Sequence, residues 1–78
     1  MKYQVIKETD EFVDAVIDLE APDRGPRTVR FFLDEDGTTV INILAFEHGR
    51  TFGLEDYFTD NEINWLWTLQ VWLLFSKK

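Results

Sequence analysis

The single histidine of this sequence is the residue best suited, by its type and its neighbours, to acid–base chemistry. His48 lies between Glu47 and Gly49, with Arg50 directly beyond. A histidine beside a carboxylate could act as a general base. The chain contains no cysteine, its single serine is Ser76, and the HExxH, GxGxxG and phosphate-loop motifs are absent. The pattern favours an exposed turn over a catalytic site, and a small enzyme acting through His48 is the alternative.

A short run of carboxylates could bind a cation. Asp34, Glu35 and Asp36 precede Gly37, but the full pattern of a calcium-binding loop is not met, because Gly37 comes too early after the acids. Asp36-Gly37 instead predicts a tight hairpin turn, because glycine adopts positive φ at little cost. No pair of acids is singled out for hydrolytic chemistry. We therefore expect a non-enzymatic protein without a metal ion or cofactor.

A longer acidic segment, residues 8–20, contains six carboxylates and no basic residue. On a strand, Asp14, Asp18 and Glu20 would share one face, and on a helix Asp14 and Asp18 would stack one turn apart. Both readings place a line of carboxylates opposite the apolar face. A solvated face is one interpretation. The hypothesis that we adopt is a partner-binding acidic face, formed by Asp14, Asp18, Glu20, Asp34, Glu35 and Asp36.

The overall charge indicates what kind of partner such a face would bind. The 78 residues include 15 acids and 8 lysines and arginines, for a formal net charge of -7. This balance argues against direct binding to nucleic acid, whose phosphates need a basic surface. It favours a basic protein partner, including one whose site normally holds nucleic acid. Arg24, Arg27 and Arg30 would neutralise part of the acidic segment if the two segments pair as a hairpin.

The elements that must position these residues are mostly strands. Residues 2–8, 28–34 and 38–47 have strand composition, while the loop 21–27 holds both prolines. Residues 9–20 fit a strand or a helix, and their valine and isoleucine content favours the strand. The sequence predicts one α+β domain, a small antiparallel β-meander of three or four strands packed by one C-terminal α-helix. A β-α-β-β-α order is the alternative.

The C-terminal segment is predicted to be an apolar helix over residues 60–76. Thr59 and Glu62 have the spacing of a capping box, which marks its start. Residues 63–75 (INWLWTLQVWLLF) show no wide polar stripe, so we expect burial on more than one side. The segment is too short to span a membrane, and we expect no membrane contact. The second flank could be covered by the loops 21–27 and 53–58, by a second copy, or by another protein.

The tryptophans of this helix suggest where a second chain would contact it. A homodimer interface is expected around Trp65, Leu69 and Trp72. The alternative function is therefore a structural or assembly module that homodimerises or joins a complex through its helix.

Size and acidity resemble those of small inhibitors: antitoxins, immunity proteins and phage-encoded anti-defence proteins. The resemblance is one of composition and covers no motif. It implies a non-enzymatic, inhibitor-like domain that docks on a basic protein surface. The absence of cysteine and of an apolar N-terminal signal segment favours a cytoplasmic protein.

Overall fold

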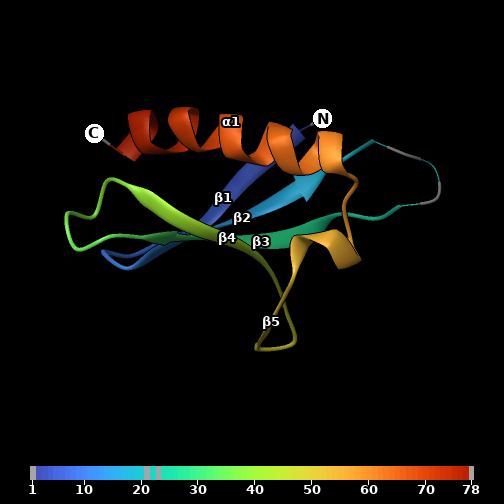
Figure 1. The fold of residues 1–78 in the computed structure, drawn as a ribbon, viewed down its shortest axis with the longest axis horizontal. Helices are drawn as coiled ribbons and strands as arrows, with labels where there is room; N and C mark the ends of the chain where they lie inside the picture. Colours follow the sequence, from blue (N-terminus) through green and yellow to red (C-terminus); the bar gives the residue numbers. More distant parts are fainter. Residues whose placement is uncertain (1, 21, 23, 78) are drawn as a thin grey trace.

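Five antiparallel strands and one long helix form the protein in the computed structural model, which describes residues 2–20, 22 and 24–77, and side chains as far as residue 71. Neighbours in the chain are neighbours in the sheet, so the strands form a meander. A short 3-10 helix, η1, leads to α1, which lies across one face of the sheet (Figure 1). The elements are β1 (Lys2–Glu8), β2 (Phe12–Asp18), β3 (Arg27–Leu33), β4 (Val40–Glu47), β5 (Arg50–Phe52), η1 (Leu54–Asp56) and α1 (Asp60–Lys77).

The predicted α+β class, antiparallel meander and C-terminal helix are confirmed, but the predicted number of strands is wrong. The additional strand is β5, which has only three residues and pairs with the end of β4. The β-α-β-β-α alternative is also wrong, because the ambiguous segment contains strand β2. That strand is hydrogen-bonded on both sides, to β1 and to β3. Its valines and isoleucine suit such a position, since branched side chains pack well on a pleated surface.

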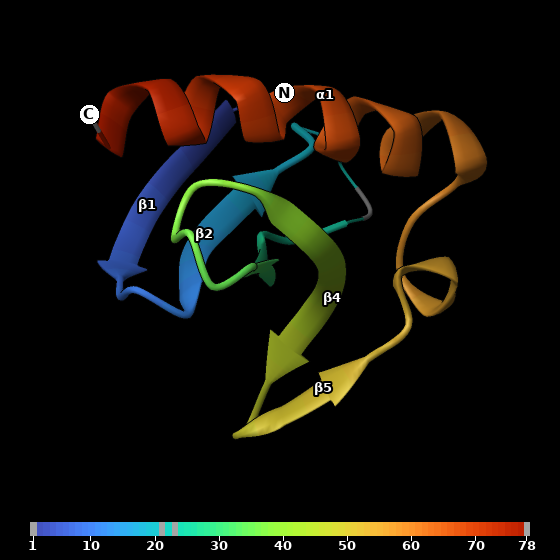
Figure 2. The ribbon, with the colours of Figure 1, turned by 60° about the vertical axis from the view of Figure 1, so that its left-hand side comes forward.

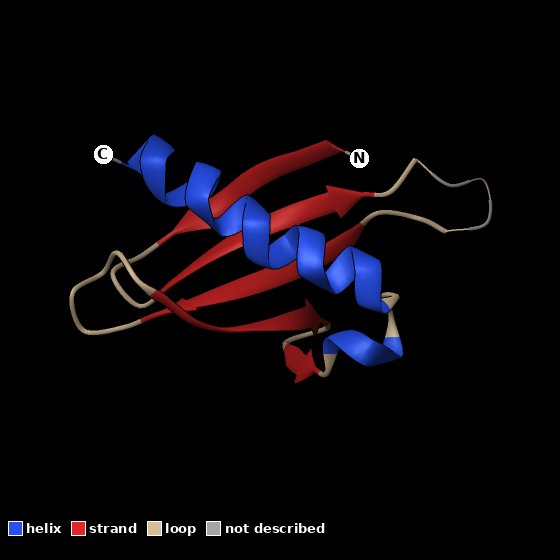
Figure 3. Ribbon diagram, turned by 45° about the horizontal axis from the view of Figure 1, so that its top comes forward, coloured by secondary structure: helices blue, strands red, loops and turns tan. Residues whose placement is uncertain are grey.

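The core lies between α1 and the sheet face that it covers. Figure 3 shows the helix crossing the strands obliquely. Leu66 and Leu69 point from α1 into this core, and Leu54 and Phe58 close it at the start of the helix. Cross-strand partners share a face, and alternate residues of β2, β3 and β4 supply the sheet side: Val13, Ala15, Ile17, Val29, Phe31, Leu33, Ile43 and Ala45.

Local sequence signals fix the turns and the start of the helix. Gly37 has φ of 69°, as the Asp36-Gly37 turn requires. His48 and Gly49, with φ of 55° and 76°, form a two-residue turn between β4 and β5. Before α1, the Thr59 Oγ1 accepts a hydrogen bond from the Glu62 N–H at 3.3 Å. The Glu62 carboxylate accepts one from the Thr59 N–H at 2.8 Å, so the predicted capping box is confirmed.

The free edge of β1 carries features that discourage pairing with another strand. Its register with β2 shifts between Val5 and Lys7, so Ile6 is an extra residue in a β-bulge. Lys2 and Lys7 place charges along the same edge. Bulges and lysines are common means of preventing one sheet from extending another. Within the described residues, no helix is both long and apolar enough to cross a membrane.

Candidate protein-interaction surfaces

The six acids that the sequence placed on one face do not lie together. Asp14 is only 4% exposed. Asp18 and Glu20 lie where β2 leads into the loop before β3, while Asp34, Glu35 and Asp36 form the turn after β3. Because β2 and β3 are antiparallel, these two groups are at opposite ends of the sheet (Figure 1). The prediction of a single acidic face is therefore wrong, since it took no account of strand direction or burial.

Asp14 is paired with a cation and is unavailable as a free acid. Arg30 lies opposite it on β3 and donates from Nε and Nη2 to the two carboxylate oxygens, at 2.8 and 2.9 Å. The guanidinium carbon lies 3.8 Å from the ring centroid of Phe12 and 3.7 Å from that of Phe46. The side-chain hydrogen bond with Asp14 raises the pKa of Arg30, against the opposing effect of burial. The expected neutralisation of acids by the arginines is confirmed for this pair.

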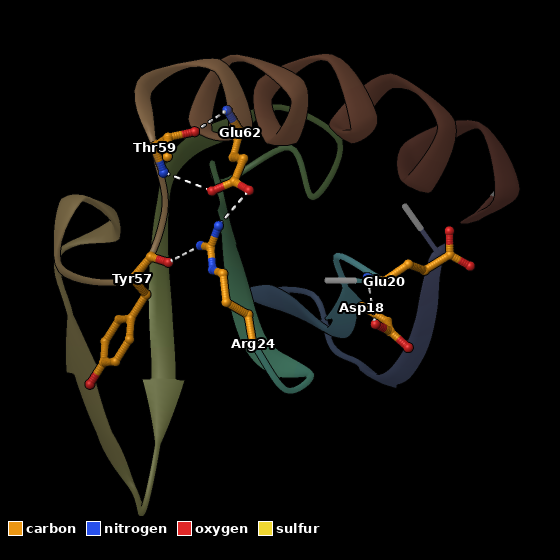
Figure 4. Close-up of polar contacts among 6 residues, drawn as sticks. All are labelled: Asp18, Glu20, Arg24, Tyr57, Thr59 and Glu62. Carbon is orange, nitrogen blue, oxygen red and sulfur yellow. Dashed lines mark hydrogen bonds and ion pairs between the residues drawn. The ribbon is translucent and has the colours of Figure 1, made fainter. Parts of the chain in front are cut away.

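Asp18 and Glu20 are also engaged locally. The Asp18 Oδ1 accepts a hydrogen bond from the Glu20 N–H at 2.8 Å. The Glu20 carboxylate pairs with the Lys2 Nζ at 3.2 Å, and both of these side chains are well exposed. Figure 4 shows Asp18 and Glu20 apart from the polar network at the start of α1. They therefore form a small, partly neutralised group at this end of the sheet.

The network at the start of α1 is centred on Arg24. Its Nη1 donates to the Glu62 carboxylate at 2.7 Å, and its Nη2 donates to the Tyr57 carbonyl oxygen (Figure 4). Burial opposes ionisation of Glu62, but the Thr59 N–H and the Arg24 guanidinium outweigh it, so the pKa of Glu62 is lowered. Arg24 thereby ties the loop between β2 and β3 to the first turn of the helix. This role is structural.

Two hairpin turns converge at the other end of the sheet and form what we call the acidic end. The Leu33 N–H donates to the Glu11 carbonyl oxygen at 2.8 Å, which joins the two turns directly. A Cβ on Gly37 would lie 3.8 Å from the Asp10 carbonyl oxygen. Neither turn contains a lysine or an arginine. The acidic end is defined by six exposed carboxylates: Glu8, Asp10, Glu11, Asp34, Glu35 and Asp36.

The Asp36 carboxylate organises the turn after β3 through three hydrogen bonds. The Thr38 and Thr39 N–H groups donate to its Oδ1 at 2.8 and 3.0 Å, and the Thr39 hydroxyl donates to its Oδ2 at 2.7 Å. These hydrogen bonds favour the ionised form and lower the pKa of Asp36 to about 2. Asp36 therefore remains charged well into the acid range.

The sheet face opposite α1, which we call the open face, is covered by no described element. On this face, residues that pair across β2, β3 and β4 form rows. One row is Phe12, Phe32 and Asn42, and the next is Asp14, Arg30 and Leu44. A shallow cavity of about 420 Å³ opens on it, lined by Ile6, Asp14, Thr28, Phe46, Glu47 and His48. The large apolar residues of this face are exposed or half-buried: Ile6, Phe12, Val16, Phe32, Leu44 and Phe46.

The open face was not identified from the sequence, although a signal for it exists. Residues 40–45 are apolar on both faces of their strand. That pattern predicts a central strand with both faces covered. Only one face meets α1, so the other keeps apolar side chains without a second layer above them.

The expected helix interface is placed differently by the structure. Leu69 is 4% exposed and Trp65 packs against the core, so both face the sheet. The side chain of Trp72 lies outside the described residues. The exposed apolar residues of the helix, as far as its side chains are described, are Trp67 (37%) and Val71 (63%). The segment 53–58 packs against the helix through Leu54 and Phe58, and the loop 21–27 contacts its first turn through Arg24, but Trp67 and Val71 stay uncovered.

His48, the candidate general base, occupies the first position of the β4–β5 turn. The two carboxylate oxygens of its neighbour Glu47 each accept a hydrogen bond from the Arg27 Nη1, at 2.9 and 3.0 Å. In the part of the chain that is described, no three histidines or acids are grouped so as to hold a metal ion. Comparison with protein-family models, curated proteins and solved structures gives no match.

Proposed function

We propose that this protein is a small, inhibitor-like, non-enzymatic binding domain that docks through its acidic end on a basic protein surface. The observation that carries the proposal is the convergence of two turns, which places six exposed carboxylates together without a basic residue in either turn. Of the acids first expected at the interface, Asp34, Glu35 and Asp36 belong to this surface. Asp14, Asp18 and Glu20 do not.

The charge distribution supports electrostatic docking at this end. The chain has a formal net charge of -7, and elsewhere several acids are paired with lysine or arginine. A concentrated patch of one sign attracts an oppositely charged surface and raises its association rate, most strongly at low salt. A basic site that normally binds nucleic acid has the complementary charge. By occupying it, the protein would exclude the nucleic acid without chemistry.

The test uses a partner captured at low salt, whose binding is then measured over a range of salt concentrations. A variant with Asp10→Asn, Glu11→Gln and Glu35→Gln removes three charges and leaves the hydrogen bonds of Asp36 intact. We expect an association rate at least about tenfold lower and a flatter salt dependence. Equal binding by wild type and variant would overturn the proposal.

A matched control separates local charge from total charge. The exposed residues Glu55, Asp56 and Asp60 lie on η1 and at the start of α1, away from the acidic end (Figure 1). Their neutralisation to glutamine and asparagine changes the net charge by the same amount. A rate reduced as much by this control would show that the partner responds to net charge alone, against docking at the acidic end.

A second candidate function is an assembly module, favoured by Trp67 and Val71. The two residues are one turn apart on α1 and are both exposed, so a second copy could bury them together. Sedimentation of the wild type at high concentration would reveal a dimer. A variant with Trp67→Gln and Val71→Thr should then sediment as a monomer, whereas a monomeric wild type would remove this candidate.

A further inference from the structure

We propose that the open face is a docking site for a basic amphipathic helix of the partner protein, which would lie where the sheet lacks a second helical layer. The basic character of that helix rests on the proposed function. The site itself rests on the geometry of the open face, which is separate from the acidic end.

The open face is more apolar than the water-facing side of an antiparallel sheet normally is. Such a side usually carries polar residues in alternation with the buried ones. Here Phe12 and Phe32 are cross-strand neighbours, and in the adjacent row Leu44 is the cross-strand neighbour of Arg30. The charges in the middle of the face neutralise each other, because Arg30 and Asp14 are joined by two hydrogen bonds. A partner covering this pair would bury two charges that already offset each other, while Lys7, whose Nζ lies 5.6 Å from the Phe12 ring centroid, carries its charge on the outer strand β1.

A helix fits this face better than an additional strand. The edge of β1 is bulged at Ile6 and carries Lys2 and Lys7, which discourages strand addition. The same sheet already accepts a helix on its other side, through Leu66 and Leu69. A helix and a sheet face bury their apolar surfaces well against each other.

The shape of the open face also suits a rounded occupant. The β4–β5 hairpin turns away from α1 (Figures 1 and 2). The cavity on this side is lined from β1 at Ile6 to the β4–β5 turn at His48, so it crosses the strands and does not follow one edge. A groove of this kind accepts apolar side chains that repeat every three to four residues on one side of a helix.

Charge complementarity selects a basic helix. The face ends at the turns that carry the acidic end, where Glu8 is the last residue of β1 and Asp10 lies in the turn after it. A helix with lysines or arginines on its outer side would place them near these carboxylates while its apolar side met the sheet. An acidic helix would be repelled by the same carboxylates.

The test uses two synthetic probes of identical composition. One peptide of about 18 residues has leucines at helical spacing on one side and lysines on the other. The second has the same residues in shuffled order, so it keeps the charge and loses the apolar side. We expect the protein to bind the ordered peptide about tenfold more tightly, which corresponds to ~1.4 kcal/mol. Amide chemical shifts should change mainly at Ile6, Val16 and Leu44.

Three variants identify the surface used. Ile6→Thr, Val16→Thr and Leu44→Thr together keep strand-forming residues, and should remove the preference for the ordered peptide. Trp67→Gln with Val71→Thr, on the helix, should leave the preference unchanged. Shifts centred on Trp67 and Val71, or no preference in the wild type, would overturn the inference. Because shifts are mapped on the wild type, the test does not depend on the threonine variant folding.

Failure of this inference can be told apart from failure of the proposed function. The acidic-end variant should weaken both peptides equally and leave the preference intact, because both probes carry the same charge. Equal affinity of wild type and acidic-end variant for both probes would count against docking by the acidic end. If the wild type shows no preference for the ordered peptide but the acidic-end variant still binds both peptides more weakly, the result counts against the open face alone.

Discussion

Arg30 and Asp14 form a two-pronged ion pair in the middle of the open face, with the guanidinium held between the rings of Phe12 and Phe46. The pair joins β2 to β3 through side chains as well as through the backbone. Because Asp14 is 4% exposed, removal of Arg30 would leave a buried charge. The arrangement explains how the sheet accommodates an acid within β2, a strand that is paired on both sides.

Loss of one partner of this pair should therefore be costly. We expect Asp14→Ala to lower the free energy of unfolding by roughly 3 kcal/mol, measured by urea denaturation. The double variant Asp14→Val with Arg30→Leu should lose much less stability than the sum of the losses from Asp14→Val and Arg30→Leu measured separately. Lys2→Ala, which breaks an exposed pair with Glu20, serves as the control and should cost less than about 1 kcal/mol. Additive single and double variants would contradict the coupling.

The turn at Asp36 should make stability depend on pH in the acid range. Its pKa is about 2 in the folded protein and 3.8 ordinarily, so the stabilisation is fully present above 3.8 and is lost as the pH falls through about 2. We expect Asp36→Asn to destabilise the protein near neutral pH and to have a smaller effect at low pH. Thr39→Val should raise the pKa of Asp36, measured by NMR titration. Glu35→Gln should leave the pKa of Asp36 below its ordinary value.

The contacts of Arg24 should be measurable as a link between the loop and α1. Arg24→Met removes hydrogen bonds to Glu62 and Tyr57, and we expect a loss of roughly 1–2 kcal/mol at neutral pH by urea denaturation. The folded-state pKa of Glu62 lies below its ordinary value of 4.5, so part of this stabilisation is lost as the pH falls below 4.5. Arg50→Met, at an exposed arginine of β5, is the control.

The turn at His48 provides a test of backbone preference. His48 has φ of 55°, a conformation in which asparagine is better tolerated. We expect His48→Asn to raise the free energy of unfolding by about 0.5 kcal/mol, and Gly49→Ala to lower it by about 1 kcal/mol. Thermal unfolding measures both changes. A large loss of stability in His48→Asn would indicate a role for the imidazole beyond the turn.

The sequence predicted the elements whose signals are local. The spacing of Thr59 and Glu62 located the start of α1, and Asp36-Gly37 located a turn, because hydrogen bonds between near neighbours form these features. The valines and isoleucine of β2 favoured a strand over a helix. The short strand β5 was not counted, since three residues carry little periodic pattern.

The grouping of side chains was decided by the tertiary structure. Strand direction put Asp18 and Asp34 at opposite ends of the sheet, and the contact between the Leu33 N–H and the Glu11 carbonyl brought together turns that are distant in sequence. The roll of α1 about its axis turned Trp65 toward the sheet and left Trp67 exposed. Composition determined that the protein is acidic, and local residue patterns predicted the α+β class. Only the packing of strands and helix, which depends on contacts between distant residues, determined where its charge and its uncovered apolar surface lie.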